Sequence, residues 1–372
     1  MKIVIAPDKF KEALSAREVA RAIERGIRRV LPDAQVDLVP MADGGDGTVD
    51  ALLSATGGSP RQTRVSDPLG RPVEAAWGVL GDGRTAVIEM AAASGLALVP
   101  VDRRDPTRTT TYGTGELIRA ALDAGVSRIL IGIGGSATTD GGTGAAQALG
   151  VTFLRADGRR FDRPLTGGDL LDISRIVVDG RDARLAKTAI EVACDVDNPL
   201  LGSRGAAAVY GPQKGATPEQ VELLDRGLAH LAELIERDLG KDVREFPGAG
   251  AAGGLGAGLV AFCGARLRPG IDIVMDATRL HERIRGADLI ITGEGRLDGQ
   301  SMMGKVIAGV GRAGQAVGVP VVALVGSVGE GAEDALKILR SYQCITPAGT
   351  PLAEALARTA ENLERMAAEV VV

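Results

Sequence analysis

The spacing of apolar residues along the first 40 positions changes twice, from strand-like to helical and back. The run KIVIAP at 2–7 is short, apolar and β-branched, as expected of a buried strand. The segment 15–32 instead carries apolar residues at helical spacing, and Ser15 with Glu18 three residues later forms a capping box. The run VDLVP at 36–40 is again strand-like. A strand, a helix and a second strand of these lengths predict a right-handed βαβ unit.

The same pattern returns near the other end of the chain. ADLIITGEG at 287–295, VPVVALVGS at 319–327 and YQCITP at 342–347 read as further buried strands. The segment 351–371 has the spacing of a closing amphipathic helix. Together with the first two strands, this is the inventory of a flavodoxin-like doubly wound parallel sheet.

The segment between these two parts has a different character. Residues 63–90 form short alternating runs separated by PLG and GDG turns, which predict antiparallel strands. Helix and strand patterns then alternate through 114–135 and 189–196. We therefore expect an α/β protein with a discontinuous Rossmann-like domain at 1–62 and 277–372 and a mixed α/β domain inserted at 63–276. A simple division near residue 150 or 280 is the alternative.

Composition limits the classes of function. Hydrophobic residues at 45% and charged residues at 24% are typical of a soluble globular protein. Aromatic residues at 2% and a net charge of -5 disfavour binding to nucleic acid or to an anionic membrane. The chain has neither an export signal nor an apolar run near the ~20 residues of a membrane span, so we expect a cytoplasmic protein.

Charged residues follow the predicted strands of the first domain. In an open α/β sheet, the carboxyl ends of the strands form the edge that binds ligands. The residues expected at this edge are Asp8, Lys9, Lys11, Asp43, Asp46, Glu294, Arg296 and Asp298, with Ser301 close behind. Plain turns at 42–48 and 293–301, and a solvated pair of lysines, are the alternatives.

Glycines concentrate in the stretch IGIGGSATTDGG at 131–142, which follows the apolar run RILI. It matches neither GxxxxGK[ST] nor GxGxxG with a distant acidic residue. Its bare N–H groups could bind phosphate oxygens, aided by the positive end of the following helix, or the loop could be a turn only. The residues concerned are Gly134, Gly135, Ser136, Thr138 and Asp140.

A second glycine-rich stretch, GAGAAGGLGAG at 248–258, is a candidate of the same kind through Gly253 and Gly254. Its alternative is a helix of small residues packed close to its neighbour. His230 and His281 lie in polar helical stretches, and the three cysteines are far apart, so neither a Ser-His-Asp triad nor a zinc site is expected.

The remaining chemistry suits phosphoryl transfer, which needs positioning, charge neutralisation and Mg²⁺. Mg²⁺ prefers one or two carboxylates plus phosphate oxygens and water, and Asp43 and Asp195 are the candidate ligands at predicted strand ends. Arg296 is the candidate clamp for a carboxylate or phosphate, because a guanidinium can donate two parallel hydrogen bonds.

Nine motifs carry a family likeness over the whole chain. In order they are MKIVIAPDKFKEALSA, MADGGDGT, IEMAAASGLALVP, TTYGTGELI, IGIGGSATTDGG, ACDVDNPLLG, YGPQKGA, PGAGAAGGLGAGL and ITGEGRLDGQS. With them the sequence resembles the type-1 glycerate kinase family. Asp46 stands where that family commonly has Glu, and Thr139 where Asn is expected. The shorter Asp46 could shift the geometry of a metal ion or water.

The resemblance implies ATP-dependent phosphorylation of D-glycerate to 2-phosphoglycerate, in a cleft between the Rossmann-like and the inserted domain, by a monomer or homodimer. Alternatives are a glycerate 3-kinase, a non-catalytic nucleotide or sugar-acid sensor, and a dehydrogenase with a degenerate dinucleotide loop. We expect catalytic roles for Lys9, Asp43, Asp195, Arg296 and Asp298. We expect nucleotide contacts from Gly134, Gly135, Ser136, Thr138, Asp140, Gly253 and Gly254, and substrate contacts from Asp8, Lys11, Asp46, Glu294 and Ser301.

Overall fold

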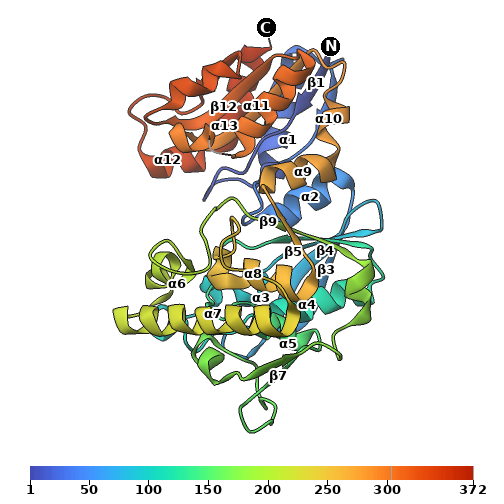
Figure 1. Ribbon diagram of the computed structural model, residues 1–372. Coiled ribbons are helices and arrows are strands. Elements are labelled where there is room, and N and C mark those ends of the chain that lie inside the picture. The colour runs from blue at the N-terminus through green and yellow to red at the C-terminus, as the bar shows by residue number, and fades with distance from the viewer. Residues whose placement is uncertain (303, 372) are drawn as a thin grey trace. The chain divides into compact units, whose positions relative to one another are not determined.

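The computed structural model describes residues 1–302 and 304–371, which fold into two compact units (Figure 1). Unit 1 comprises Met1–Asp43, Gly47–Gly58 and the chain from Pro269 onward. Unit 2 comprises Gly44–Asp46 and Ser59–Arg268. The boundaries expected from the sequence, at 62 and 276, lie a few residues beyond these.

Unit 1 contains the two ends of the chain. Its strands are β1 (Lys2–Ile5), β2 (Gln35–Leu38), β11 (Leu289–Leu297), β12 (Val321–Val328) and β13 (Ser341–Cys344). Its helices are α1 (Ala16–Val30), α2 (Thr48–Thr56), α9 (Gly270–Thr278), α10 (Leu280–Arg283), α11 (Val306–Val317), α12 (Leu352–Ala357) and α13 (Thr359–Val370), with 3-10 turns η6 (Gly299–Met302) and η7 (Ala332–Lys337).

The sheet of unit 1 is parallel and has the order β13-β12-β11-β1-β2. Numbered within the unit, this is 2-1-3-4-5, so the predicted flavodoxin-like sheet is confirmed. After β1 the chain builds β2 on one side, and β11 then pairs on the other side of β1. The order of the strands therefore reverses between β1 and β11.

Helices cover both faces of this sheet. On one face α1 and α13 pack over a core that includes Ile5, Ile23, Ile291 and Leu363 (Figure 1). The capping box predicted at Ser15 and Glu18 is present at the start of α1. The closing helix predicted at 351–371 is broken at Arg358 into α12 and α13.

Unit 2 is built around a mixed sheet. Its strands are β3 (Ser59–Ser66), β4 (Pro72–Val79), β5 (Thr85–Glu89), β6 (Arg128–Gly132), β7 (Thr152–Leu154), β8 (Arg175–Val177), β9 (Ala189–Ala193) and β10 (Arg266–Arg268). Its helices are α3 (Ala91–Ser94), α4 (Tyr112–Asp123), α5 (Thr143–Ala148), α6 (Ala206–Tyr210), α7 (Pro218–Leu239) and α8 (Ala251–Cys263). Short 3-10 turns are η1 (Leu96–Leu98), η2 (Val101–Arg103), η3 (Gly167–Asp172), η4 (Ala183–Lys187) and η5 (Pro212–Lys214).

The main sheet of unit 2 has the order β10-β9-β6-β5-β4-β3. The pairs β3–β4 and β4–β5 are antiparallel, as the alternating pattern at 63–90 predicts, and the other pairs are parallel. The glycine-rich stretch 131–142 therefore leaves the carboxyl end of the inner strand β6 and leads into α5. No helix in the described residues is long and apolar enough to cross a membrane.

Candidate active site

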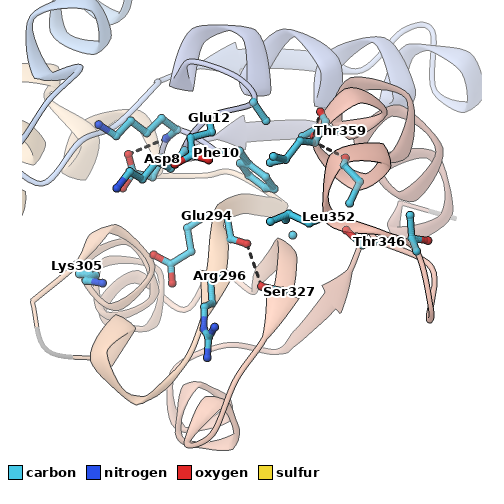
Figure 2. A pocket seen from close by; sticks show the side chains of 18 of the residues that line it. Asp8, Phe10, Glu12, Glu294, Arg296, Lys305, Ser327, Thr346, Leu352 and Thr359 are labelled. Atoms are coloured by element: carbon cyan, nitrogen blue, oxygen red, sulfur yellow. Dashed lines mark hydrogen bonds between the residues drawn. The ribbon is translucent and has the colours of Figure 1, made fainter.

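A cavity of about 610 Å³ opens in unit 1 at the point where the strand order reverses. The backbone N–H of Asp8, just after β1, donates a 2.8 Å hydrogen bond to the carbonyl oxygen of Gly293 in β11. This bond places Asp8 beside Glu294, and both side chains line the cavity with Asp43 (Figure 2). In doubly wound sheets the reversal point is where ligands bind. Several of the charged residues that the sequence predicts at this edge therefore line a cavity, among them Asp8, Asp43 and Glu294.

Two carboxyl groups of this cavity, those of Asp8 and Glu294, have raised pKa values. Burial, followed by the negative charge of Asp43, raises the pKa of Asp8 to about 7. Burial likewise raises the pKa of Glu294 to about 7. Glu294 is only 6% exposed, and among the described residues its Oε1 accepts no hydrogen bond. A buried carboxyl oxygen without a donor is costly, so unit 1 holds a polar group that a ligand could satisfy.

Cationic side chains line the same cavity. Lys9, Lys11, Arg296 and Lys305 all contribute to it. Lys305 is the N-cap residue of α11, and sequence reasoning missed it. Its position directly before a helical pattern was the available signal, because the N-terminal end of a helix favours anions.

The loop after β11 uses several predicted residues internally. The Nε of Arg296 lies 3.1 Å from Oδ2 of Asp298, and the Arg296 side chain is 67% exposed. The buried Ser301 hydroxyl accepts from the N–H of Asp298 at 3.2 Å and donates to the carbonyl of Arg296 at 3.3 Å. Ser301 therefore fixes the loop in this structure, whereas the side chain of Arg296 is exposed and lines the cavity.

The glycine-rich loop of unit 2 is exposed only at its tip. Gly134 and Gly135 are exposed, whereas Ser136, Thr138 and Asp140 are buried. A Cβ at Gly134 would meet only Gly45 Cα, at 3.6 Å, and one at Gly135 only Ala91 Cβ, at 3.7 Å. Within the described residues, neither glycine N–H donates to a protein acceptor. Both N–H groups are therefore available to an anion, and Gly135 also has a left-handed φ of +72° that a turn requires.

Asp140 is expected from the sequence to contact the nucleotide, whereas the structure buries its side chain inside unit 2. Its carboxylate is fully buried and accepts from the N–H and hydroxyl of Thr111, each at 2.8 Å, and from the N–H groups of Gly142 at 3.1 Å and Gly144 at 3.2 Å. Burial raises the pKa of Asp140, and these hydrogen bonds oppose the rise. Asp140 anchors the loop to the start of α4.

Lys214 is a buried functional group that sequence reasoning left unassigned. Its Nζ donates to the backbone carbonyl of Thr138 at 2.5 Å, and the side chain is 1% exposed. Burial lowers the pKa of Lys214 to about 7, and the nearby Asp140 opposes this shift. The motif YGPQKGA around it was the signal, but nothing in the sequence showed that this lysine lies beneath the loop 131–142.

Gly253 and Gly254 are required by packing, which favours the alternative interpretation of their stretch. A Cβ at Gly253 would lie 2.0 Å from the carbonyl oxygen of Thr138, and one at Gly254 would lie 3.0 Å from Gly141 Cα. Both glycines are buried with left-handed φ values of +71° and +85° inside the irregular first turn of α8. They support the loop 131–142 from behind and present no open surface to a nucleotide.

The remaining predicted residues are divided between the units. Asp43 lines the cavity of unit 1, whereas Asp195 is exposed after β9 in unit 2, and Asp46 is exposed in unit 2. Among the described residues no group of three or more His, Cys, Asp or Glu side chains could hold a metal ion. Asp8, Asp43 and Glu294 supply the carboxylate oxygens that Mg²⁺ prefers, so they fit this ion only as part of a set completed by phosphate oxygens and water.

The histidines take no part in either site. His230 lies in α7, where its Nε2 contacts the carbonyl oxygen of Ile173 at 2.7 Å, and His281 is exposed in α10. Carboxyl groups and lysines thus lie at the strand-order reversal of unit 1, which is where doubly wound α/β sheets bind their ligands.

Comparison with known proteins identifies the family. Residues 3–372 match the model of the glycerate kinase family, and the chain belongs to this family. It is 54% identical over 328 residues to "Glycerate 2-kinase" of Escherichia coli K12, which covers 88% of this chain and 86% of that protein. It is 51% identical over 371 residues to "Glycerate kinase" of Bacillus subtilis 168, covering 100% and 97%. A crystal structure assigned to glycerate kinase 2 of Salmonella typhimurium LT2 superposes with a TM-score of 0.92 at 51% identity, covering 100% of this chain and 97% of that one.

Proposed function

We propose that this chain phosphorylates D-glycerate with ATP and releases 2-phosphoglycerate and ADP. The observation that carries the proposal is the 54% identity to the glycerate 2-kinase of Escherichia coli, within a family match that spans residues 3–372. The cavity at the reversal of strand order supports it, since carboxyl and ammonium groups there are the groups that phosphoryl transfer uses.

The reaction requires a proton acceptor for the attacking hydroxyl. The hydroxyl oxygen of glycerate forms a bond to the γ-phosphorus, the bond from that phosphorus to the β,γ-bridging oxygen breaks, and ADP leaves with the electron pair. The hydroxyl proton passes to a carboxylate of the protein. Asp8 suits this role because its pKa of about 7 is matched to neutral pH.

Positive charge is needed where the phosphate oxygens lie. Lys9 and Lys305 line the same cavity as Asp8, and the positive end of α11 adds to them. Bound Mg²⁺ would neutralise phosphate charge, and Asp43 of unit 1 and Asp195 of unit 2 are two separate candidates for a carboxylate ligand of this ion. In unit 2, the free N–H groups of Gly134 and Gly135 are proposed to bind an anionic part of the reactants.

A coupled assay for ADP tests the proposal. The purified chain with ATP and Mg²⁺ is expected to release ADP only when D-glycerate is added, and much more slowly with L-glycerate. ADP release that does not depend on the acid would contradict the kinase proposal. Binding of ATP and D-glycerate without turnover would instead identify a sensor.

A further inference from the structure

The cavity of unit 1 has two chemically different ends. In Figure 2 the side chains of Phe10, Leu352, Thr346 and Thr359 lie on one side of the cavity, which Ala13, Ala355 and Leu356 also line. The other is lined by Asp8, Lys9, Asp43, Glu294 and Lys305. In the view of Figure 2, Glu294 lies between the pair Phe10–Leu352 and Lys305. A ligand that fills this cavity therefore needs an apolar part and a charged part.

D-glycerate does not have this shape. It has three carbons, all bearing oxygen, and thus no apolar part to bury. A cavity of about 610 Å³ lies in the range of roughly 300–1,000 Å³ that holds drug-sized ligands. The nucleotide is the reactant of this size with a flat, weakly polar base at one end and phosphates at the other.

The apolar end is built to receive such a base. Phe10 is 4% exposed and belongs to the core of unit 1, and its backbone is held by paired hydrogen bonds with Leu14, each of 2.9 Å, so it contributes to the cavity wall from a largely buried position. Leu352, the first residue of α12, is 72% exposed although it lines the cavity, and Leu356 follows one turn later. An exposed leucine that lines the same cavity as a largely buried aromatic ring gains contact when a planar base packs against it.

The charged end offers separate partners for a ribose and for phosphates. Glu294 has a buried Oε1 without a donor among the described residues, and a ribose hydroxyl can supply that donor. Lys305 begins α11, a helix of 12 residues whose N-terminal end favours anions. Oε1 of Glu294 and the N-terminal residue Lys305 of α11 are two separate features, and both residues line the same cavity.

We propose that this cavity is the nucleotide site, with the purine base between Phe10, Leu352 and Leu356, the ribose at Glu294 and the phosphates toward Lys9 and Lys305. The inference rests on the proposed ATP-dependent function and adds where and by which residues the nucleotide is recognised. It assigns the base and the ribose to unit 1, whereas the glycine-rich stretches of unit 2 are expected from the sequence to contact phosphates.

Calorimetric titration of the full chain with ADP, adenosine and inorganic tripolyphosphate tests this inference. Leu352→Glu places a charge at an exposed position, so it leaves folding intact and weakens ADP and adenosine at least about tenfold. Tripolyphosphate binding and the KM for D-glycerate stay within about twofold, since neither ligand reaches the apolar end. Leu336→Glu is the matched control, because Leu336 is 52% exposed in η7 of the same unit and does not line the cavity.

Lys305→Met should give the opposite pattern. It weakens the binding of tripolyphosphate and ADP and leaves the binding of adenosine unchanged. Unaltered ADP affinity in Leu352→Glu overturns the inference, as does a raised KM for D-glycerate with ADP binding intact. The failure of the function itself looks different. A wild-type chain that binds ADP through Leu352 but never phosphorylates glycerate refutes the proposed kinase activity and leaves the nucleotide site standing.

Discussion

The backbone N–H of Asp8 donates a 2.8 Å hydrogen bond to the carbonyl oxygen of Gly293, and this bond joins the loop after β1 to the end of β11. As a result the carboxyl groups of Asp8 and Glu294 share one partly enclosed cavity near Asp43. Burial is the main reason that both pKa values rise to about 7, and for Asp8 the negative charges of Asp43 and Glu294 add to the rise.

Glu294 should therefore make the protein less stable as pH rises. Its pKa is about 7 in the folded chain against 4.5 for an ordinary glutamate, so the folded state binds more protons between these values. Stability linked to this group is present at low pH and is lost as pH rises through about 7. Glu294→Gln should raise the free energy of unfolding by about 2 kcal/mol near pH 8 and leave it unchanged near pH 5.

Urea unfolding of both proteins at the two pH values measures this difference. Glu330→Gln is a control for removal of an acidic residue from the same unit outside the cavity. An equal effect of Glu294→Gln at both pH values would show that its carboxyl is not held protonated by its surroundings.

The tip of the glycine-rich loop separates a ligand role from a turn role. Gly134 is exposed with an ordinary φ, so Gly134→Ala should leave the melting temperature within about 2 °C of wild type. Its added methyl group should nevertheless keep an anion from the N–H groups and reduce kcat/KM about tenfold, through the KM for ATP or through turnover.

Gly135→Ala gives the contrasting result. Its φ of +72° is strained for alanine, so this variant should lose about 1 kcal/mol of stability in addition to activity. Steady-state kinetics and thermal melts of both variants are the measurements. Wild-type kinetics in Gly134→Ala would show that the loop tip serves only as a turn and does not bind a ligand.

Arg296 is exposed, and its ion pair with Asp298 contributes little to stability. If its guanidinium grips a carboxylate or phosphate of a reactant, Arg296→Lys should lower kcat/KM at least about tenfold, since lysine cannot donate two parallel hydrogen bonds. Arg25→Lys, in an exposed pair with Glu364, is the matched control. Equal efficiency of the two variants would remove Arg296 from the site.

Magnesium dependence tests the two proposed carboxylate ligands separately. Asp43→Asn and Asp195→Asn should each require more Mg²⁺ for half-maximal rate, by about tenfold, with an unchanged circular dichroism spectrum. Asp197→Asn is the control for Asp195, because Asp197 is exposed on the same segment and pairs with Arg204. A titration curve that overlays wild type eliminates the residue concerned.

Much of the fold follows from the sequence because the inner strands of unit 1, β1 and β11, are almost entirely buried. The runs containing Ile5 and Ile291 are continuous and apolar, and the capping pair Ser15 and Glu18 marks the start of α1. The break at Arg358 was not predictable, because the apolar spacing continues across it and the hydroxyl of Thr359 bonds back to Ala355 and Leu356 carbonyls.

The site was predictable where it follows from strand ends, as for Asp8, Asp43 and Glu294. Roles that depend on tertiary packing were not. Asp140 and Gly253 are residue types that often bind ligands. In this structure, however, Asp140 accepts hydrogen bonds from backbone N–H groups of its own loop, and Gly253 lets the backbone of Thr138 approach closely. Leu352 is the opposite case. The sequence placed this apolar residue only on an amphipathic helix, yet it lines the cavity.

Phosphorus NMR of the reaction product tests the central claim most directly. The full chain is incubated with ATP, Mg²⁺ and D-glycerate, and the proton-coupled phosphorus signal of the product is recorded. Phosphate on the C2 oxygen couples to the single proton of C2 and gives a doublet, which is the predicted result. A triplet from the two protons of C3 would assign the chain as a 3-kinase, and the absence of a new phosphate ester would contradict the account altogether.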